Sequence, residues 1–380
     1  MRLLRAMVAA VALLTVGVAG AETVYLEVTN PLGTNRPGAV VVAPASVLGE
    51  FVASGAYTGY ARDANPMPVQ ADDLDGDGGA EEIAFVLDLG PSETLTVAVD
   101  TEAPWEGTRY TEARTSWRYE QYAAMDTDRI AYGQYGVYAP VSLPSGLQWD
   151  CYGKRPKAWS LCLDALRTVN YHNDNPVAVD FLIVGNSLGL GGLLLGEGRP
   201  VNGKTAQFSH EVIANGPVRA GIRVIVADWT TPTGGKYRGV ADYMVYAHND
   251  FIDAMVSIEP EVAKADHFGA GMIKLDEIQQ FLGSKTEGIL AQWGQQDTIV
   301  GETGLGIIFP PGDFYAWRYL EDESSYGFLL SPDVRGDRIV EKHLRFVGVW
   351  EHGGIADGRS FMDHLRGLAT RLREPVTVRP

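Results

Sequence analysis

The sequence predicts an all-β sandwich, and three observations support this class. Short segments such as Thr23–Val28 alternate apolar and polar residues, which is the pattern of a strand with one buried face. Turn-forming pairs such as Asn30-Pro31 recur between these segments. Clear helical spacing occurs only in Asp357–Arg373, where Pro375 follows the last turn. Frequent turns between short strands, with few helices, are typical of a sandwich.

The expected strands follow one another along the chain without a linker. They are Thr23–Val28, Ala39–Val42, Ile83–Leu89, Thr94–Val99, Ala214–Val226, Ala241–Ala247, Phe251–Ile258, Gly271–Leu275, Ile289–Trp293, Gly306–Phe309 and Phe346–Val349. No repeat, low-complexity tract or shift in composition separates them. We therefore expect a single domain over residues 22–380.

The first 21 residues have the pattern of a secretory signal peptide. Arg2 and Arg5 precede an apolar run, and small residues end at Ala21, so we expect cleavage before Glu22. The apolar run is too short to span a bilayer. We therefore expect a secreted or periplasmic protein with no membrane insertion.

The mature chain is strongly acidic. Loss of Arg2 and Arg5 with the signal peptide changes the formal net charge from −17 to −19. Such a charge argues against nucleic acid as a partner, and an acidic polysaccharide would need a local cationic pocket. Export permits a disulfide between Cys151 and Cys162, and two free buried thiols are the alternative.

An acidic loop precedes the strand at Ile83. Its carboxylates lie at alternate positions around glycines, so they can converge on one hard cation; they are Asp73, Asp75, Asp77 and Glu81. The loop is not an EF-hand, because Ala84 stands where the bidentate glutamate would be. We expect either a structural calcium site or a solvated hairpin turn, and no cofactor that the activity requires.

The densest group of polar and aromatic side chains lies between Trp149 and Gly192. Four glycines in Gly185–Gly192 permit unusual backbone conformations and let a ligand or a neighbouring strand come close. This combination makes the segment a candidate functional site. The candidate residues are Trp149, Tyr152, Lys154, Arg155, Tyr171, His172, Asp174 and Asn186, with Arg118 from the preceding aromatic-rich segment.

Several short motifs resemble, in the same order, a family known as domain of unknown function 4861. They are Asp75–Gly78 before a strand, Tyr152-Gly153-Lys154, Tyr171-His172, Gly185–Gly192 and Asn215–Arg219. The resemblance implies a galactose-mutarotase-like supersandwich of two large antiparallel sheets. It also implies a place in bacterial polysaccharide degradation, where one related enzyme is believed to be a dehydratase of uronic-acid oligosaccharides.

Elimination on a uronate begins with removal of the proton beside the carboxylate, so it needs a base and a neutralising cation. His172 is the expected base, because an imidazole has a reference pKa of about 6.5 and is largely neutral near pH 7. Asp174 is expected to orient this imidazole, and Tyr152 or Tyr171 to protonate the leaving oxygen.

The remaining candidates would hold the substrate. The cation is expected from Lys154, Arg155 or Arg118, and sugar contacts from Asn186 and Trp149. Each candidate also has a structural interpretation, as a strand-end histidine, a loop cation or a turn cap.

Two other functions stay open on the same fold. Glycoside hydrolysis or epimerisation would use a pair of carboxylates, separated by about 5–9.5 Å in hydrolases. Asp150, Asp174 and Asp180 are the nearest candidates for that pair. A non-catalytic carbohydrate-binding protein is the third interpretation, and fold alone does not choose among the three.

Overall fold

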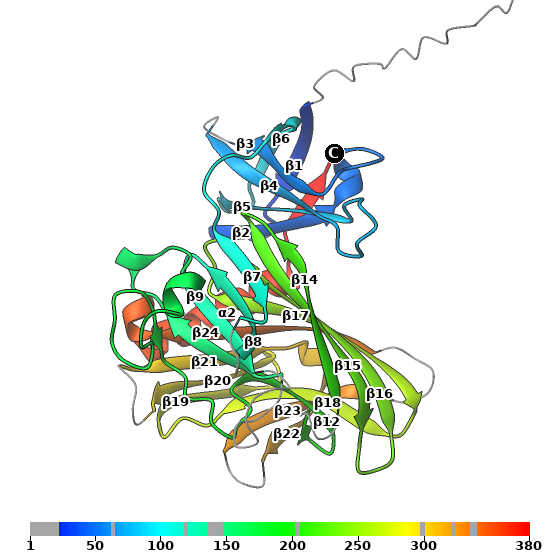
Figure 1. Cartoon of the computed structure of the whole chain (residues 1–380), viewed down its shortest axis with the longest axis vertical. Coiled ribbons are helices and arrows are strands. Elements are labelled where there is room, and N and C mark those ends of the chain that lie inside the picture. The colour runs from blue at the N-terminus through cyan, green and yellow to red at the C-terminus, as the bar shows by residue number, and fades with distance from the viewer. Residues whose placement is uncertain are drawn as a thin grey trace, which may run out of the picture.

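The structure of the protein is a computed structural model that describes residues 23–61, 65–117, 121–135, 147–201, 206–296, 301–320, 324–334 and 340–380. These residues form three antiparallel sheets of seven, ten and eight strands. The predicted signal peptide lies outside the described residues. Figure 1 shows the seven-stranded sheet at one end of the molecule and the two larger sheets below it.

The first sheet is built from both ends of the chain. Its strands, in spatial order, are β2 (Arg36–Pro44), β5 (Glu82–Leu89), β4 (Pro66–Asp72), β3 (Gly55–Tyr60), β6 (Thr94–Pro104), β1 (Thr23–Thr29) and β25 (Thr377–Arg379). The alternating residues Leu26, Val41 and Phe85 point into a hydrophobic core that belongs to this sheet. The prediction of a single domain over residues 22–380 stays a prediction.

The second sheet carries the candidate site. Its strands run in the order β22 (Phe314–Tyr319), β23 (Ser325–Val334), β18 (Asp266–Ile273), β12 (Leu190–Gly196), β10 (Trp149–Gly153), β9 (Ile130–Tyr135), β8 (Gln121–Thr127) and β7 (Thr111–Thr115). Two short strands join its edges, β11 (Val179–Asp180) beside β10 and β13 (Arg199–Pro200) beside β12.

The third sheet packs face to face with the second. Its strands run in the order β14 (Gln207–Asn215), β15 (Arg219–Thr230), β16 (Lys236–Tyr246), β17 (Phe251–Val262), β24 (Val340–Trp350), β21 (Thr303–Ile308), β20 (Ile289–Gln295) and β19 (Glu277–Ser284). Trp149 from the second sheet meets Tyr243 from the third in the shared core. This arrangement confirms the predicted all-β sandwich of large antiparallel sheets.

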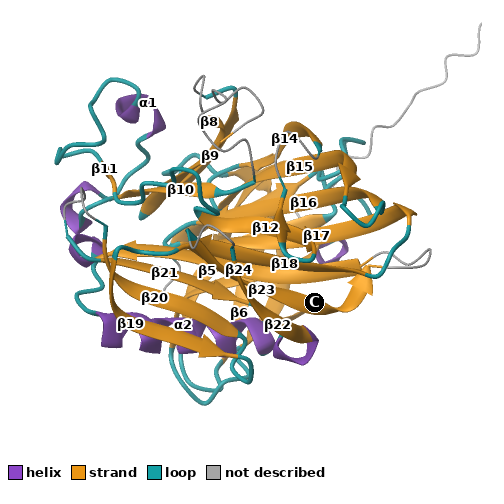
Figure 2. Ribbon diagram, turned by 90° about the horizontal axis from the view of Figure 1, so that it is seen from below, coloured by secondary structure: helices purple, strands orange, loops and turns teal. Residues whose placement is uncertain are grey.

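One long helix covers the outer face of the third sheet. It is α2 (Gly358–Arg373), and it lies along β19, β20 and β21 (Figure 2). Asp357 caps it by accepting a hydrogen bond from the backbone N–H of Ser360 at 2.8 Å. Its apolar face buries Phe361 and Leu365, as the sequence spacing predicted.

The other helical segments are short. They are α1 (Leu163–Leu166) and the 3₁₀ turns η1 (Ala45–Leu48), η2 (Pro156–Ala158), η3 (Pro311–Asp313) and η4 (Glu351–Gly353). None of the helices in the described ranges is long and apolar enough to cross a membrane.

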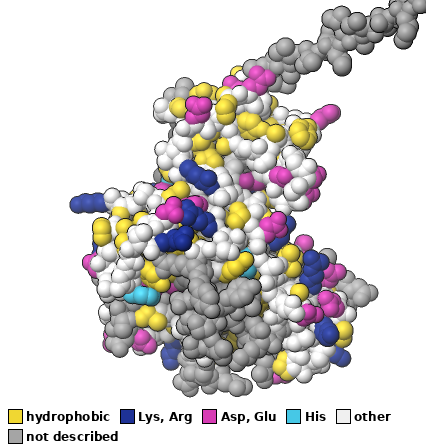
Figure 3. Space-filling model, in the orientation of Figure 1, with side chains coloured by type: hydrophobic (Ala, Val, Ile, Leu, Met, Phe, Trp, Pro, Cys, Tyr) yellow, Lys and Arg dark blue, Asp and Glu magenta, His cyan; other side chains and the backbone are white. Residues whose placement is uncertain are grey.

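A buried ion-pair cluster anchors the first sheet to the sandwich. Arg219, which begins β15 and is 1% exposed, pairs with Asp72 at 2.6 Å and with Glu82 at 2.7 Å. Gln70 of β4 accepts the backbone N–H groups of Val218 and Arg219, each at 2.9 Å. On the face seen in Figure 3, basic side chains gather just below the first sheet and acidic ones are scattered over both parts.

Candidate functional site

The alternation of β10 sends its side chains to opposite faces of the second sheet. Trp149 and Cys151 point into the core between the sheets. Asp150 and Tyr152 point to the other face, which the chain segment after β10 covers with Leu163 and its neighbours. One face of β10 therefore packs into the core between the sheets, and the other face carries the polar side chains.

Two carboxylates lie buried together on the polar face. Asp180 on β11 stands directly opposite Tyr152 on β10, so its side chain shares the face of Asp150. Asp150 is 1% exposed and Asp180 is 5% exposed. Asp150 accepts hydrogen bonds from the Tyr152 hydroxyl at 3.2 Å and the Tyr135 hydroxyl at 3.4 Å. We call these four residues the acid cluster.

Burial affects the titration of Asp150 in the acid cluster. Burial, reinforced by repulsion from Asp180, raises the pKa of Asp150 well above its usual range. Both effects disfavour the charged form of this carboxyl group.

His172 lies at the outer end of the acid cluster. Its Nδ1 is 3.0 Å from the Asp180 carboxylate, while the imidazole side chain is 64% exposed and the Asp180 side chain 4% exposed. A carboxylate at Nδ1 holds the ring orientation and the tautomer with its proton on Nδ1, so Nε2 is the basic nitrogen. Tyr171 packs beside it, with its ring 4.2 Å from the imidazole and 5.3 Å from the Tyr152 ring.

The loop that carries His172 is fixed by amide hydrogen bonds. The carbonyl of Tyr171 accepts the Asp180 N–H at 2.9 Å, and the side chain of Asn170 accepts the His172 N–H at 3.2 Å. The side-chain amide of Asn175 donates to the carbonyls of Asn173 at 3.0 Å and Ala178 at 2.9 Å. The imidazole is therefore positioned by the backbone as well as by Asp180.

Asp174 does not have the role that the sequence suggested. It is exposed and pairs with Arg155 at 2.7 Å, whereas Asp180 contacts the imidazole. The correction has a simple cause: β11 pairs with β10, and this pairing turns Asp180 rather than Asp174 toward His172. Arg155 is held in the same loop by donating to the Asn175 carbonyl at 3.3 Å, and its guanidinium lies 5.2 Å from the Trp350 ring.

Lys154 is also placed differently from the expectation. Its side chain is 0% exposed, and its ammonium contacts the buried Asp126 carboxylate and donates to the carbonyls of Thr127 at 2.5 Å and Ser160 at 2.6 Å. Burial opposes its charge, but Asp126 outweighs that effect and raises the pKa of Lys154. An ammonium committed in this way cannot neutralise a substrate carboxylate, so its role is structural.

The structure places the remaining candidates from the sequence as follows. Trp149 is 0% exposed in the core between the sheets, which removes it from sugar contact. Asn186 is exposed in a turn, and Arg118 lies outside the described residues. Gly191 has a φ of +75°, and a Cβ there would overlap the Phe346 ring, so this glycine serves strand packing. Cys151 and Cys162 are both buried and not bonded to each other.

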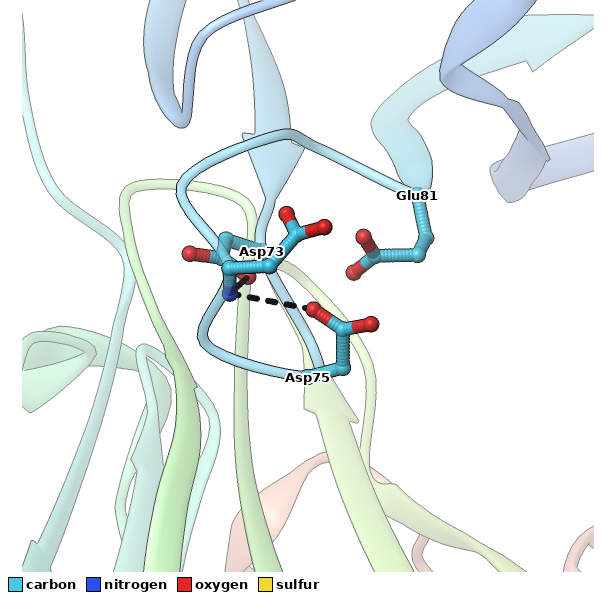
Figure 4. A group of neighbouring side chains, drawn as sticks. Asp73, Asp75 and Glu81 are labelled. Atoms are coloured by element: carbon cyan, nitrogen blue, oxygen red, sulfur yellow. Dashed lines mark hydrogen bonds between the residues drawn. The ribbon is translucent and has the colours of Figure 1, made fainter.

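The acidic loop has the geometry that the sequence predicted for its carboxylates. One ligand oxygen from each of Asp73, Asp75, Asp77 and Glu81 lies within 4.8 Å of the others. Asp73, Asp75 and Glu81 turn toward one another in Figure 4. Asp73 also accepts the backbone N–H groups of Gly76 at 2.7 Å and Gly78 at 2.8 Å, which suits a hairpin turn as well. Calcium at this loop stays a prediction.

Comparisons with known proteins place the chain as follows. Residues 28–378 match the model of a family described as domain of unknown function DUF4861. A search of curated proteins gives no match.

Two solved structures resemble the fold. One is described as an alpha-mannosidase from Enterococcus faecalis V583, with a TM-score of 0.55 and 10% identity over 93% of this chain and 45% of that one. The other is described as a protein in the glycosyl hydrolase family 38 from Enterococcus faecalis, with a TM-score of 0.51 and 9% identity over 94% and 47% of the two chains. The chain therefore spans less than half the length of either, and the likeness concerns the fold.

Proposed function

Because the chain belongs to the DUF4861 family, as its motif order predicted, and shares its fold with glycoside hydrolase proteins, we propose that it is a carbohydrate-active enzyme. Its proposed substrates are uronic-acid oligosaccharides, and its proposed reaction is elimination, as in a lyase or dehydratase. The observation that carries the proposal is the exposed His172 imidazole held at Nδ1 by the buried Asp180 carboxylate.

The proposed reaction uses His172 as the base. Nε2 takes the proton from the ring carbon that bears the uronate carboxylate, and the electron pair of that C–H bond forms the double bond as the C4–O bond breaks. Asp180 stabilises the imidazolium that results, without taking its proton. Tyr171, half-buried beside His172, is the proposed donor of a proton to the departing oxygen.

Arg155 is the proposed partner of the substrate carboxylate. Charge builds on that carboxylate as the proton leaves, so a fixed cation there stabilises the transition state. The Arg155 side chain is 34% exposed and tied to the loop of His172 through Asp174 and Asn175. Binding would exchange the Asp174 carboxylate for that of the sugar.

The same geometry disfavours hydrolysis by a carboxylate pair. Such a pair must flank the glycosidic bond with both groups reaching the sugar. Asp150 and Asp180 are at most 5% exposed and are already engaged with Tyr152 and His172. A single exposed base above a buried carboxylate suits proton abstraction better.

The test follows the ultraviolet absorbance of the conjugated unsaturated uronate that elimination creates. We expect His172→Ala to lower kcat by about 10²- to 10⁴-fold with an unchanged thermal transition. His267→Ala is the matched control. His267 lies on β18, two strands from β10 in the second sheet, and its ring stacks on that of Tyr315 with 3.8 Å between the ring centres. Asp180→Asn should lower kcat and shift the pH–rate profile, as expected for a positioning residue.

The outcomes separate the candidate functions. Reducing ends released without the absorbance would establish hydrolysis. Binding of oligosaccharides without turnover would establish a carbohydrate-binding protein. Full activity in the His172→Ala variant would refute the assignment of the base.

A further inference from the structure

A second region, distinct from the acid cluster, has the features of a binding site. A cavity of about 780 Å³ lies where the first sheet meets the sandwich. Its walls come from the first sheet, the β8–β9 turn, the β16–β17 turn, the end of β10 and the segment after it, the end of β24, and α2 with the turn before it. Its lining includes Arg129, Gly153, Trp159, Trp350 and Arg371, and it includes neither Tyr152 nor His172.

Two buried indole N–H donors on this lining lack a hydrogen-bond partner. They are Trp350 Nε1 and Trp159 Nε1. Trp350 is only 2% exposed, so its indole N–H is shielded from bulk water. An unsatisfied buried donor costs free energy unless a ligand or an ordered water accepts its hydrogen.

Two glycines let the backbone approach the Trp350 indole closely. A Cβ on Gly153 would overlap Trp350 Nε1, and a Cβ on Gly353 would lie 2.9 Å from it. Both glycines line the cavity. Neither has a positive φ, so the backbone conformation alone does not require glycine here. Close approach to the indole explains both residues.

Of the two guanidinium groups on the lining, that of Arg371 has no ion-pair partner among the described residues, and that of Arg129 pairs with Asp128. Asp250 is occupied by His364 at 3.1 Å, and Asp88 accepts the backbone N–H of Gly38 at 2.8 Å. Arg371 donates only weakly, to the Pro37 carbonyl at 3.4 Å, and forms no ion pair with a described residue. The Arg129 guanidinium lies 3.3 Å from the centre of the Trp159 ring and 3.3 Å from the Asp128 carboxylate.

These groups together define a ligand chemistry. Indole rings suit the C–H face of a pyranose, N–H donors suit its oxygens, and two guanidinium groups suit a carboxylate. A volume of about 780 Å³ falls in the range of small-molecule sites. We propose that this cavity is a binding site for a uronic-acid saccharide, with the sugar carboxylate near Arg129 and Arg371 and sugar oxygens accepting from Trp159 and Trp350.

The cavity lies close to the His172 loop without being part of it. Arg155, which pairs with Asp174 of that loop, has its guanidinium 5.2 Å from the Trp350 ring. A bound saccharide in the cavity would thus neighbour the segment that carries the proposed base. Binding at the cavity does not require chemistry at His172, so the two proposals can fail separately.

Calorimetric titration with trisaccharides of galacturonic, glucuronic and mannuronic acid tests the inference, with their methyl esters as neutral probes. We expect at least one acidic trisaccharide to saturate the protein below about 1 mM and its ester to bind at least tenfold more weakly. Trp350→Phe keeps an aromatic ring and removes the donor, and Arg129→Gln removes a charge; each should weaken binding about tenfold or more.

Matched variants separate binding from folding. Trp293→Phe removes an indole N–H that is bonded to Glu302 at 2.7 Å, and Arg366→Gln removes a guanidinium paired with Glu287; neither residue lines the cavity. Both should bind the trisaccharide as the parent protein does. Trp350→Phe and Trp293→Phe both shrink a buried ring and should lower Tm, so their binding is compared at a temperature where both remain folded. His172→Ala should bind normally.

Three results would overturn the inference. They are the failure of all three acidic trisaccharides to bind, equal binding of acid and ester, and unchanged affinity in both Trp350→Phe and Arg129→Gln. Loss of binding in His172→Ala alone would instead place the saccharide at the acid cluster.

Discussion

Replacement of Lys154 by methionine should destabilise the protein strongly, although the two side chains have similar volumes. The ammonium is 0% exposed, faces Asp126 and donates to the carbonyls of Thr127 and Ser160. Its removal leaves the Asp126 carboxylate buried with the Cys162 N–H, at 2.6 Å, as its remaining strong donor. Breaking one side of a buried ion pair costs about 3–5 kcal/mol. With an unfolding entropy of about 2.1 cal/mol/K per residue, that corresponds in this chain to a fall in Tm of roughly 4–6 °C.

A double-mutant cycle, measured by calorimetry and denaturant unfolding, checks whether the loss of stability comes from the broken Lys154–Asp126 pair. The double variant Lys154→Met/Asp126→Asn should lose less stability than the sum of the losses in the two single variants. The difference should be up to about 3 kcal/mol, because the double variant leaves neither charge buried without its partner. Arg366→Met is the exposed control, since Arg366 and Glu287 are 46% and 37% exposed, and it should cost at most about 1 kcal/mol. A small loss in Lys154→Met, or strict additivity in the cycle, would refute a structural role for Lys154.

Two further predictions concern pH and calcium. Burial lowers the pKa of His210 from 6.5 to about 4. Between these pH values the unfolded chain binds a proton that the folded protein does not bind. Stability should therefore fall as the pH drops through this window. His210→Gln should reduce that fall, measured as denaturation midpoints at neutral and acidic pH; an unchanged pH slope would contradict it. If calcium binds the acidic loop, a chelator should lower Tm in the parent protein but not in Asp75→Asn, and saturation at a hundred times Kd would correspond to about 2.7 kcal/mol. A Tm insensitive to chelator would leave the loop as a hairpin turn.

The fold could be predicted in class because its signals are local. Alternation in segments such as Thr23–Val28, and the cap and stop of Asp357–Arg373, depend on neighbouring residues only. The separate core of the first sheet was not foreseen, since it depends on strands far apart in sequence. The Asn215–Arg219 motif reads as a turn, but Arg219 serves as an ion-pair anchor whose partners lie more than a hundred residues away.

Part of the candidate site could also be predicted from local signals. Tyr171 and His172 stand out by residue type, and the structure places them beside the acid cluster. The choice between Asp174 and Asp180 depends on the pairing of β11 with β10, which no local pattern encodes. Alternation along β10 does place Asp150 and Tyr152 on one face, and this signal could have identified the cluster. The burial of Lys154 depends on Asp126, which another strand supplies.

The pairing of β25 with β1 has a consequence for biosynthesis. Glu27 lies opposite Arg379, so the first sheet joins residues that are far apart in the sequence. The ribosome releases residues 23–104 early, yet the β1 edge lacks its neighbour until residues 377–379 have been made. An exposed strand edge is a template for unwanted pairing, and here Thr377–Arg379 cover it. Truncation before Thr377 would leave this edge open however well the sandwich had folded.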